Sequence, residues 1–203
     1  MTYEEFHTDD LAELTEFYET TLFSSIDFKS FDMTDVTFEE CRFSGCSFDE
    51  VLLASTNFTD CSFNQCSFVL TKFDNTALHD VHFKECKLVG IDFTYCNEFL
   101  FALEFTESIL DNIFLANRKM KKTGFTKCTI AESDFRYVDF SEANFSKTTF
   151  RNVLFRSCNL QKADFRTAEG YLIDPEQNSL KNALFTLPEA QSFLGFLGIK
   201  IDS

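Results

Sequence analysis

An apolar residue returns at every fifth position through much of the chain. Between Thr34 and Phe93 these positions all hold Phe or Leu: Phe38, Phe43, Phe48, Leu53, Phe58, Phe63, Phe68, Phe73, Leu78, Phe83, Leu88 and Phe93. A small or β-branched residue, such as Val36 or Cys41, stands two places before each of them. The other three positions of each pentad are mostly polar.

A period of five matches neither the period of about 3.6 of a helix nor the period of about 2 of a strand. It is satisfied if each pentad forms one short edge followed by a turn. The large and the small residue would then point inward, and the other three residues would face water. Four such edges would close a square coil, so the sequence predicts a solenoid.

The pentads begin at Leu22 and keep one register as far as Phe93. A second register runs from Leu100 to Phe165, and seven residues separate Phe93 from Leu100 where five are expected. About two extra residues therefore lie near Tyr95, Cys96 and Asn97, where we expect a bulge or a short loop at a corner.

Pentads such as Cys41-Arg42-Phe43-Ser44-Gly45 and Ala143-Asn144-Phe145-Ser146-Lys147 resemble those of the pentapeptide-repeat family. The resemblance covers roughly Thr21 to Phe165. It implies an all-β solenoid, a right-handed quadrilateral β-helix of about seven coils. We expect one domain over residues 1–203, with an N-terminal cap (1–20), two repeat blocks (21–97 and 98–165) and a C-terminal segment (166–203).

The two ends of the chain depart from the pentad pattern. Leu11, Leu14 and Tyr18 are spaced as on a helix behind Thr8, Asp9 and Asp10, so the sequence predicts a short N-terminal helix. Arg166 to Gln177 contains Gly170 and Pro175 and is typical of a loop. Leu180 and Phe185 then return to the second register and predict a last partial coil.

Pro188 is placed to start a C-terminal helix that Gly198 would end. Ile199 to Ile201 could add a final strand. The tail is similar to the C-terminal segment of the quinolone-resistance members of the family, the Qnr and MfpA group, which dimerise there. The resemblance implies a homodimer through Leu187, Phe193, Leu194, Phe196, Leu197 and Ile199. The alternative is a helix that only closes its own coil stack.

Every cysteine falls on the small inward position of a pentad: Cys41, Cys46, Cys61, Cys66, Cys86, Cys96, Cys128 and Cys158. We expect free thiols that act as small core residues. Offsets of twenty residues would stack Cys41 on Cys61, and Cys46 on Cys66 and Cys86, close enough to oxidise under stress. No tetrahedral set of zinc ligands converges in this pattern.

The pattern of small inward residues fails near the two extra residues, which we call the register break. Glu98 and Arg118 occupy small-residue positions twenty residues apart, so we expect them either to pair or to turn outward. Phe99, Phe101 and Phe114 fall at positions that should face water. They are either an apolar patch that contacts a partner or side chains that repack under the bulge.

The net charge of −15 lies almost entirely in the first half. Residues 1–97 hold 19 acids and 5 bases, whereas residues 98–203 hold 14 acids and 13 bases. Such a field repels nucleic acid and anionic membranes and attracts proteins with basic grooves. The expected carriers are the outward acids Asp27, Asp32, Asp35, Glu39, Glu40, Asp49, Glu50, Asp60, Asp74, Asp80, Glu85 and Asp92.

No pattern points to an enzyme, a cofactor or a metal. His7, His79 and His82 are scattered, and no nucleophile elbow, phosphate-binding loop or metal-binding spacing occurs. The N-terminal stretch is acidic where a signal peptide would be basic, and no long apolar run exists, so we expect a cytoplasmic protein.

Two functions follow as hypotheses. The protein resembles the topoisomerase-binding members of the family, which implies an acidic, rod-shaped DNA mimic in the DNA-binding groove of DNA gyrase or topoisomerase IV. The charge is less uniform than in such a rod, and no long loop is inserted. The alternative is a generic interaction scaffold for an unknown protein partner, which would dock through Phe99, Phe101 and Phe114.

Overall fold

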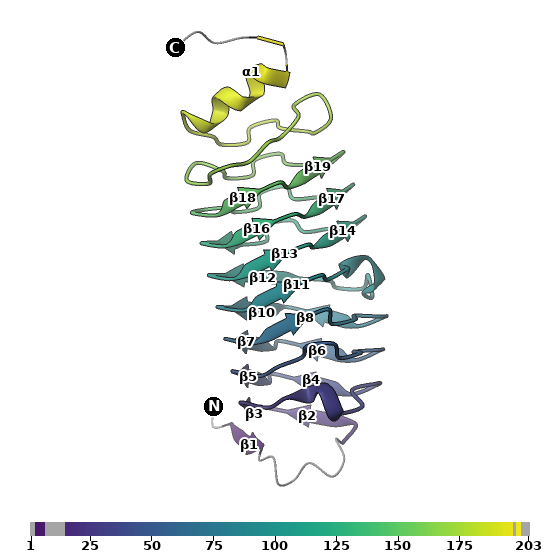
Figure 1. The fold of residues 1–203 in the computed structure, drawn as a ribbon. Coiled ribbons are helices and arrows are strands. Elements are labelled where there is room, and N and C mark those ends of the chain that lie inside the picture. Colours follow the sequence, from purple (N-terminus) through teal and green to yellow (C-terminus); the bar gives the residue numbers. More distant parts are fainter. Residues whose placement is uncertain (1–2, 7–14, 197, 200–203) are drawn as a thin grey trace.

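The structure is a computed structural model that describes residues 3–6, 15–196 and 198–199. It is a parallel β-solenoid of about seven turns with one short C-terminal helix, α1 (Ser192–Phe196), as the pentads predict. The coils stack into a rod with the two ends of the chain at opposite ends of the stack (Figure 1).

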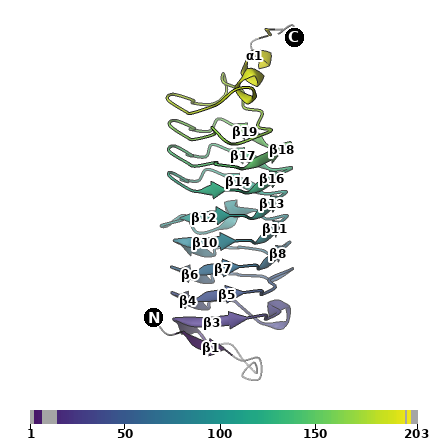
Figure 2. The same ribbon diagram turned by 90° about the vertical axis from the view of Figure 1, so that its left-hand side faces the viewer.

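The strands form four parallel sheets, which we call sides one to four in their order along each coil. Side one contains β1 (Glu4–Phe6), β3 (Thr21–Ser24), β5 (Arg42–Ser44), β7 (Ser62–Asn64), β10 (Val81–Lys84), β12 (Leu103–Thr106) and β15 (Phe125–Thr126). Figure 2 faces this side of the rod. Side two contains β8 (Ser67–Val69), β11 (Lys87–Val89), β13 (Ile109–Asp111), β16 (Thr129–Ala131) and β18 (Thr149–Arg151).

The other two sheets each cover part of the rod. Side three contains β14 (Phe114–Ala116), β17 (Asp134–Arg136) and β19 (Leu154–Arg156). Side four contains β2 (Phe17–Glu19), β4 (Thr37–Glu39), β6 (Asn57–Thr59) and β9 (Ala77–His79). Single bridges continue the stacking between these strands. Short 3-10 turns are η2 (Phe28–Ser30), η3 (Phe93–Tyr95) and η4 (Glu189–Gln191).

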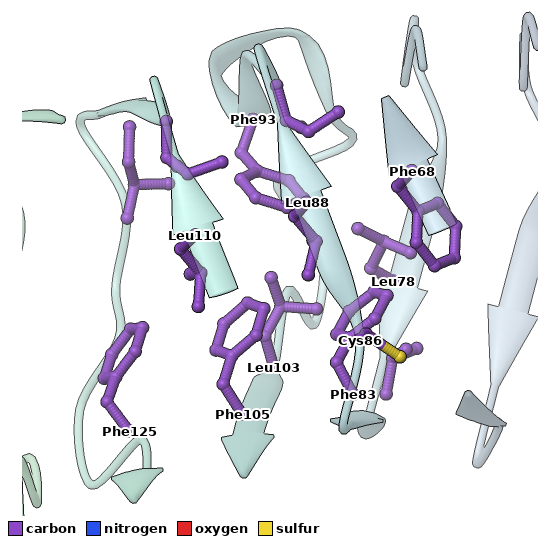
Figure 3. Close-up of a cluster of buried hydrophobic side chains, with 14 of the residues drawn as sticks. Phe68, Leu78, Phe83, Cys86, Leu88, Phe93, Leu103, Phe105, Leu110 and Phe125 are labelled. Carbon is purple, nitrogen blue, oxygen red and sulfur yellow. The ribbon is translucent and has the colours of Figure 1, made fainter. Parts of the chain in front are cut away.

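The core is a set of side-chain columns along the axis, because partners in the first half are twenty residues apart. Phe43, for example, pairs with Phe23 and Phe63. An unbroken column of phenylalanines runs along side one from Phe23 to Phe185, with ring centroids 4.5 to 5.2 Å apart. Figure 3 shows the large residues of neighbouring coils meeting at the centre.

The corners explain why the pentad has five residues. The residue two places after the central one turns the chain, and it has a positive φ at most corners, as in Glu40 (52°), Asp60 (53°) and Asp80 (49°). Most of these residues are not glycine. Their conformation is held because both neighbouring strands are fixed in the sheet ladders.

The N-terminal helix expected around Tyr18 is wrong where the structure describes this region. Tyr18 lies in β2, which pairs in parallel with β4, and its ring stacks on Phe38 at 5.4 Å. Leu11 and Leu14 lie outside the described residues. The solenoid thus begins before Thr21, because the pairing of β2 with β4 prevails over a weak helical spacing.

The segment expected as a loop, Arg166 to Gln177, continues the core instead. Ala168, Tyr171 and Ile173 are buried, and Glu169 pairs with Thr149 on side two. Gly170 is needed here because its φ is +73° and an added Cβ would collide with the Phe150 carbonyl oxygen. The glycine marks a close backbone approach, not a break in the coil.

The C-terminal helix is confirmed between Glu189 and Phe196 as η4 followed by α1. It ends as predicted at Gly198, whose φ is +71° and whose N–H donates to the Gly195 carbonyl. The Ile199 N–H donates to the Leu194 carbonyl, which completes a glycine-ended helix terminus. Ile199 is not in a strand, and Lys200 and Ile201 lie outside the described residues.

Candidate partner-binding surface

The register break interrupts side four. Up to Asn97, whose N–H donates to the Thr76 carbonyl, the chain keeps the first register. Partners on the two sides of the break are 22 residues apart, as in Val81 with Leu103, and later partners are again twenty apart, as in Phe105 with Phe125. The two extra residues therefore lie between Glu98 and Ala102, slightly later than predicted. The strands of side four end at β9, and bridges resume at Lys119 with Asp139.

The break exchanges the expected places of Leu100 and Phe101. Leu100, predicted to point inward, is 63% exposed, whereas Phe101, predicted to face water, is only 8% exposed. The added length carries the chain past the corner before it turns in, so Phe101 meets Phe93 in the core at 6.3 Å. Phe114 is half-buried under the Arg136 guanidinium. Of the predicted apolar patch, only Phe99 is strongly exposed, at 70%.

Of the two arrangements expected for Arg118 and Glu98, the structure has the ion pair, but the Arg118 side chain is buried and the Glu98 side chain is exposed. The Arg118 Nη1 lies 3.0 Å from Glu98 Oε1, with 4% of the Arg118 side chain and 79% of the Glu98 side chain exposed. Arg118 Nη2 also donates to the carbonyls of Thr94 and Cys96 at 2.8 Å each. The guanidinium thus supplies hydrogen bonds to two backbone carbonyls at the break, where the strand pairing of side four is interrupted.

The twelve predicted acids lie on sides two, three and four and at the corners, and they are not equivalent. Asp27, Asp32, Asp49 and Asp92 accept hydrogen bonds from backbone N–H groups two to twenty residues away. Hydrogen bonds from Thr34 hold the pKa of Asp32 below its usual value. Glu50 and Glu85 lie 2.7 and 3.5 Å from Lys29 and Lys84. These six acids therefore already make contacts within the coil.

The other six acids make no ion pair and no side-chain hydrogen bond within the described part of the chain: Asp35, Glu39, Glu40, Asp60, Asp74 and Asp80. Glu40, Asp60 and Asp80 occupy the same corner of three successive coils, between sides four and one. We call these three the acidic row. Stacked strands are about 4.8 Å apart, so the row repeats a negative charge at about that spacing.

Beyond the break the same corner holds two lysines with Glu142 between them. Lys122 and Lys162 hold the corresponding positive-φ positions, and Lys119 and Lys121 lie beside them on side four. Lys121 and Lys122 share Glu142 at 3.2 and 3.9 Å, while Lys162 makes no ion pair in the described residues. Inspection of the sequence at twenty-residue offsets could have found both rows, but only the fold shows that they share one edge.

The eight thiols are free and buried, as predicted. Burial raises the pKa of Cys128 to about 11. Among the described residues no group of three metal-binding side chains converges. His79 lies against the Phe99 carbonyl at 2.8 Å, and His82 faces Glu104 at 3.4 Å. His7 lies outside the described residues.

The residues predicted to dimerise have different positions at the C-terminal end. Leu187, Phe196 and Ile199 are exposed, whereas Phe193 packs its ring on Phe185 at 4.8 Å, and Leu194 is half-buried. The Leu197 side chain lies outside the described residues. In the parts of the chain that the structure describes, no helix is long and apolar enough to cross a membrane.

Comparison with known proteins gives two matches to family models. A model of pentapeptide repeats matches residues 133–168, and a model of the SV2A/B/C luminal domain matches residues 13–95. No curated protein matches the chain.

Among solved structures, the chain is similar to QnrB1, a plasmid-mediated fluoroquinolone resistance protein. A trypsin-treated form has 18% identity and a TM-score of 0.46, with 100% of both chains covered. The full-length form has 16% identity and a TM-score of 0.36, over 90% of this chain and 100% of that one.

HetL, from the cyanobacterium Nostoc sp. strain PCC 7120, is involved in the regulation of heterocyst differentiation. It has 10% identity and a TM-score of 0.42, over 87% of this chain and 89% of its own. The pentads and the four-sided parallel solenoid match a pentapeptide-repeat β-helix, and residues 133–168 match the model of that repeat.

Proposed function

We propose that this protein is a non-enzymatic binding protein whose acidic N-terminal half occupies a basic, DNA-binding groove of a cytoplasmic protein partner. DNA gyrase and topoisomerase IV are the proposed partners, and protection from quinolones is the proposed consequence. The similarity of the C-terminal segment to that of the quinolone-resistance pentapeptide-repeat proteins makes these partners the first to test.

The observation that carries the proposal is the set of acids without partners on a rigid rod. Within the described residues, Glu40, Asp60 and Asp80 are neutralised by no base, and they project from consecutive coils whose backbone is fixed by ladder hydrogen bonds. A fixed line of charge needs little ordering on binding, so its electrostatic complementarity to a basic groove is not offset by a large entropic cost.

The uneven charge predicts which part of the rod binds. The C-terminal half has nearly balanced charge and offers little attraction to a basic groove. We therefore expect the N-terminal half, up to the register break, to enter the groove, and the C-terminal half to lie outside it.

The test is a gyrase supercoiling assay titrated with the protein at low and moderate salt, with and without a quinolone. We expect inhibition that fades with salt, because ion contacts between exposed groups are screened. Replacing the acidic row (Glu40→Gln, Asp60→Asn, Asp80→Asn) should weaken inhibition by about tenfold or more. The matched control (Glu50→Gln, Asp74→Asn, Glu85→Gln) removes the same charge elsewhere and should act like the wild type.

Two results would contradict the proposal. Absence of any effect on gyrase or topoisomerase IV at tens of micromolar protein would exclude these partners. Equal loss in the acidic-row and control variants would show that net charge alone, and not this row, determines binding.

A second candidate is an interaction scaffold that docks through the break. The exposure of Phe99 together with its neighbour Leu100 supports it, because adjacent exposed apolar side chains form a small apolar patch. Binding of this kind would be insensitive to salt and would be lost in Phe99→Ser, whereas the acidic-row variant would bind normally.

We also propose that the exposed C-terminal residues Leu187, Phe196 and Ile199 form a homodimer contact. Light scattering after size exclusion should give the mass of a dimer, and Leu187→Ser with Phe196→Ser should give a monomer. Because this contact is apolar, it should persist at high salt.

A further inference from the structure

The edge between sides four and one carries opposite charges on the two sides of the register break. The acidic row lies on the N-terminal side, and Lys122 and Lys162 hold the same corner on the C-terminal side. Phe99 and Leu100, exposed by 70% and 63%, lie between the two rows. The charge distribution is thus ordered along one edge, with an apolar centre.

The positions of these charges are reciprocal about the break. Asp80 lies one coil before it and Lys122 one coil after it, whereas Glu40 and Lys162 lie three coils away on either side. At two coils Asp60 corresponds to Glu142, a like charge that Lys121, 3.2 Å away, offsets within its own chain. A second copy turned antiparallel would therefore place each acidic end against a basic end.

We propose that this edge is a self-complementary surface on which a second copy of the chain binds antiparallel, about a two-fold axis at Phe99 and Leu100. In a parallel face-to-face pair, acids would oppose acids and lysines would oppose lysines, which costs free energy. The antiparallel pair is isologous and closed, because each contact is made twice. The two apolar side chains supply the dry centre, and the charges set the orientation.

This dimer covers the acidic row. A copy paired in this way cannot present Glu40, Asp60 and Asp80 to a basic partner, so self-association and partner binding compete for one surface. The pairing itself does not depend on the identity of any partner, and it can be tested on the isolated protein.

The test uses charge reversal followed by mixing. One variant carries Glu40→Lys, Asp60→Lys and Asp80→Lys, and the other carries Lys119→Glu, Lys122→Glu and Lys162→Glu. Lysine and glutamate already occupy positive-φ corners in this chain, for example Lys122 and Glu50, so the exchanges fit the backbone. Leu187→Ser and Phe196→Ser are included in all samples so that the proposed C-terminal contact does not contribute. Circular dichroism melting checks that each variant is folded.

Sedimentation equilibrium at about 0.05 M salt should show the background protein dimerising, and each reversed variant should have a dissociation constant raised by about tenfold or more. An equimolar mixture of the two reversed variants should associate one to one. The control Glu50→Lys, Asp74→Lys and Glu85→Lys, with an equal charge change elsewhere, should dimerise like the background.

Three outcomes would overturn the proposal. The first is a background protein that stays monomeric at low salt, and the second is a mixture that fails to associate. The third is growth of open polymers with concentration, which would indicate a staggered head-to-tail contact in place of the closed pair. None of these measurements contains gyrase, so a failure here leaves the proposed function standing, and a failure of the gyrase assay leaves this surface standing.

Discussion

At the scale of the residue, the small inward position of the pentad fills space and also donates a hydrogen bond. Thr56 and Thr71 donate to the carbonyls of Met33 and Phe48 in the preceding coil at 2.6 and 2.7 Å, and Cys61 Sγ lies 3.4 Å from the Phe38 carbonyl. This use explains why Thr, Ser and Cys are common at a buried position where only a small volume is required.

The hydrogen bond of the Thr71 hydroxyl should contribute measurably to the free energy of unfolding. Thr71→Val keeps the shape but removes the donor, so we expect the free energy of unfolding to fall by about 1 to 2 kcal/mol in urea titrations. The reverse exchange at the equivalent position one coil earlier, Val51→Thr, brings a donor near the Phe28 carbonyl and should cost less. A Thr71→Val protein as stable as the wild type would refute the role of this bond.

The buried thiols should make the fold sensitive to alkali. Burial raises the pKa of Cys128 to about 11, so between the unfolded value near 9 and 11 the native state keeps a proton that the unfolded chain loses. The contribution of this thiol to the free energy of unfolding is therefore complete below pH 9. It is lost as pH rises from 9 to 11, by up to about 1.4 kcal/mol per pH unit.

The matched variant for this prediction is Cys128→Ala. The free energy of unfolding, measured in reductant between pH 8 and pH 10.5, should fall less steeply in Cys128→Ala than in the wild type. Equal slopes would mean that this thiol titrates similarly in both states.

At the scale of the element, the solenoid tolerates an irregular coil when specific groups replace the lost ladder contacts. The widened turn after η3 is visible in the teal part of the ribbon (Figure 1). There Arg118 satisfies two carbonyls and Phe101 fills the core position that a regular pentad centre would hold.

Arg118 should therefore matter far more than its partner. Arg118→Met leaves two carbonyls without these donors and should destabilise the protein by about 3 to 5 kcal/mol in chemical unfolding. Glu98→Gln alters an exposed group and should cost about 1 kcal/mol or less. If the free energy of unfolding falls equally in the two variants, the ion pair and not the carbonyl contacts stabilises the irregular coil.

Gly170 offers a second test of a close approach. Gly170→Ala forces a Cβ against the Phe150 carbonyl oxygen in addition to a positive φ, and should lower the free energy of unfolding by about 2 kcal/mol or more. Gly45→Ala is the control, since its φ is +63° but its nearest atom lies 3.6 Å away. It should show only the conformational cost, about 1 kcal/mol.

At the scale of the whole molecule, stacking identical coils places like charges over one another. Asp60 lies between Glu40 and Asp80 in the acidic row, at about one coil spacing from each. Repulsion within the row consequently lowers the free energy of unfolding. A binding role would explain why the row is kept, since binding residues are often retained for function at the expense of stability.

Removing the central charge should stabilise the rod. Asp60→Asn is expected to raise the free energy of unfolding by about 0.5 kcal/mol at low salt, and the gain should shrink as salt screens the row. Asp74→Asn, flanked by uncharged Ala54 and Thr94 in the neighbouring coils, is the control and should have no comparable effect. A gain that is equal for both, or independent of salt, would contradict this account.

The solenoid, its register and the buried thiols could be predicted from the sequence alone, because a five-residue period with two inward positions fits a repeated short edge and turn. The sequence also placed the two extra residues and the Arg118 and Glu98 pair nearly correctly. Three features depend on the stacking of the coils and not on the local pattern: Tyr18 lies in a strand, Tyr171 lies in the core, and Leu100 and Phe101 exchange places. In each case pairing with the neighbouring coil outweighed the local preference. Which acids lack partners, and which share an edge with the lysines, depends on contacts twenty residues away, so only the stacked coils could reveal it.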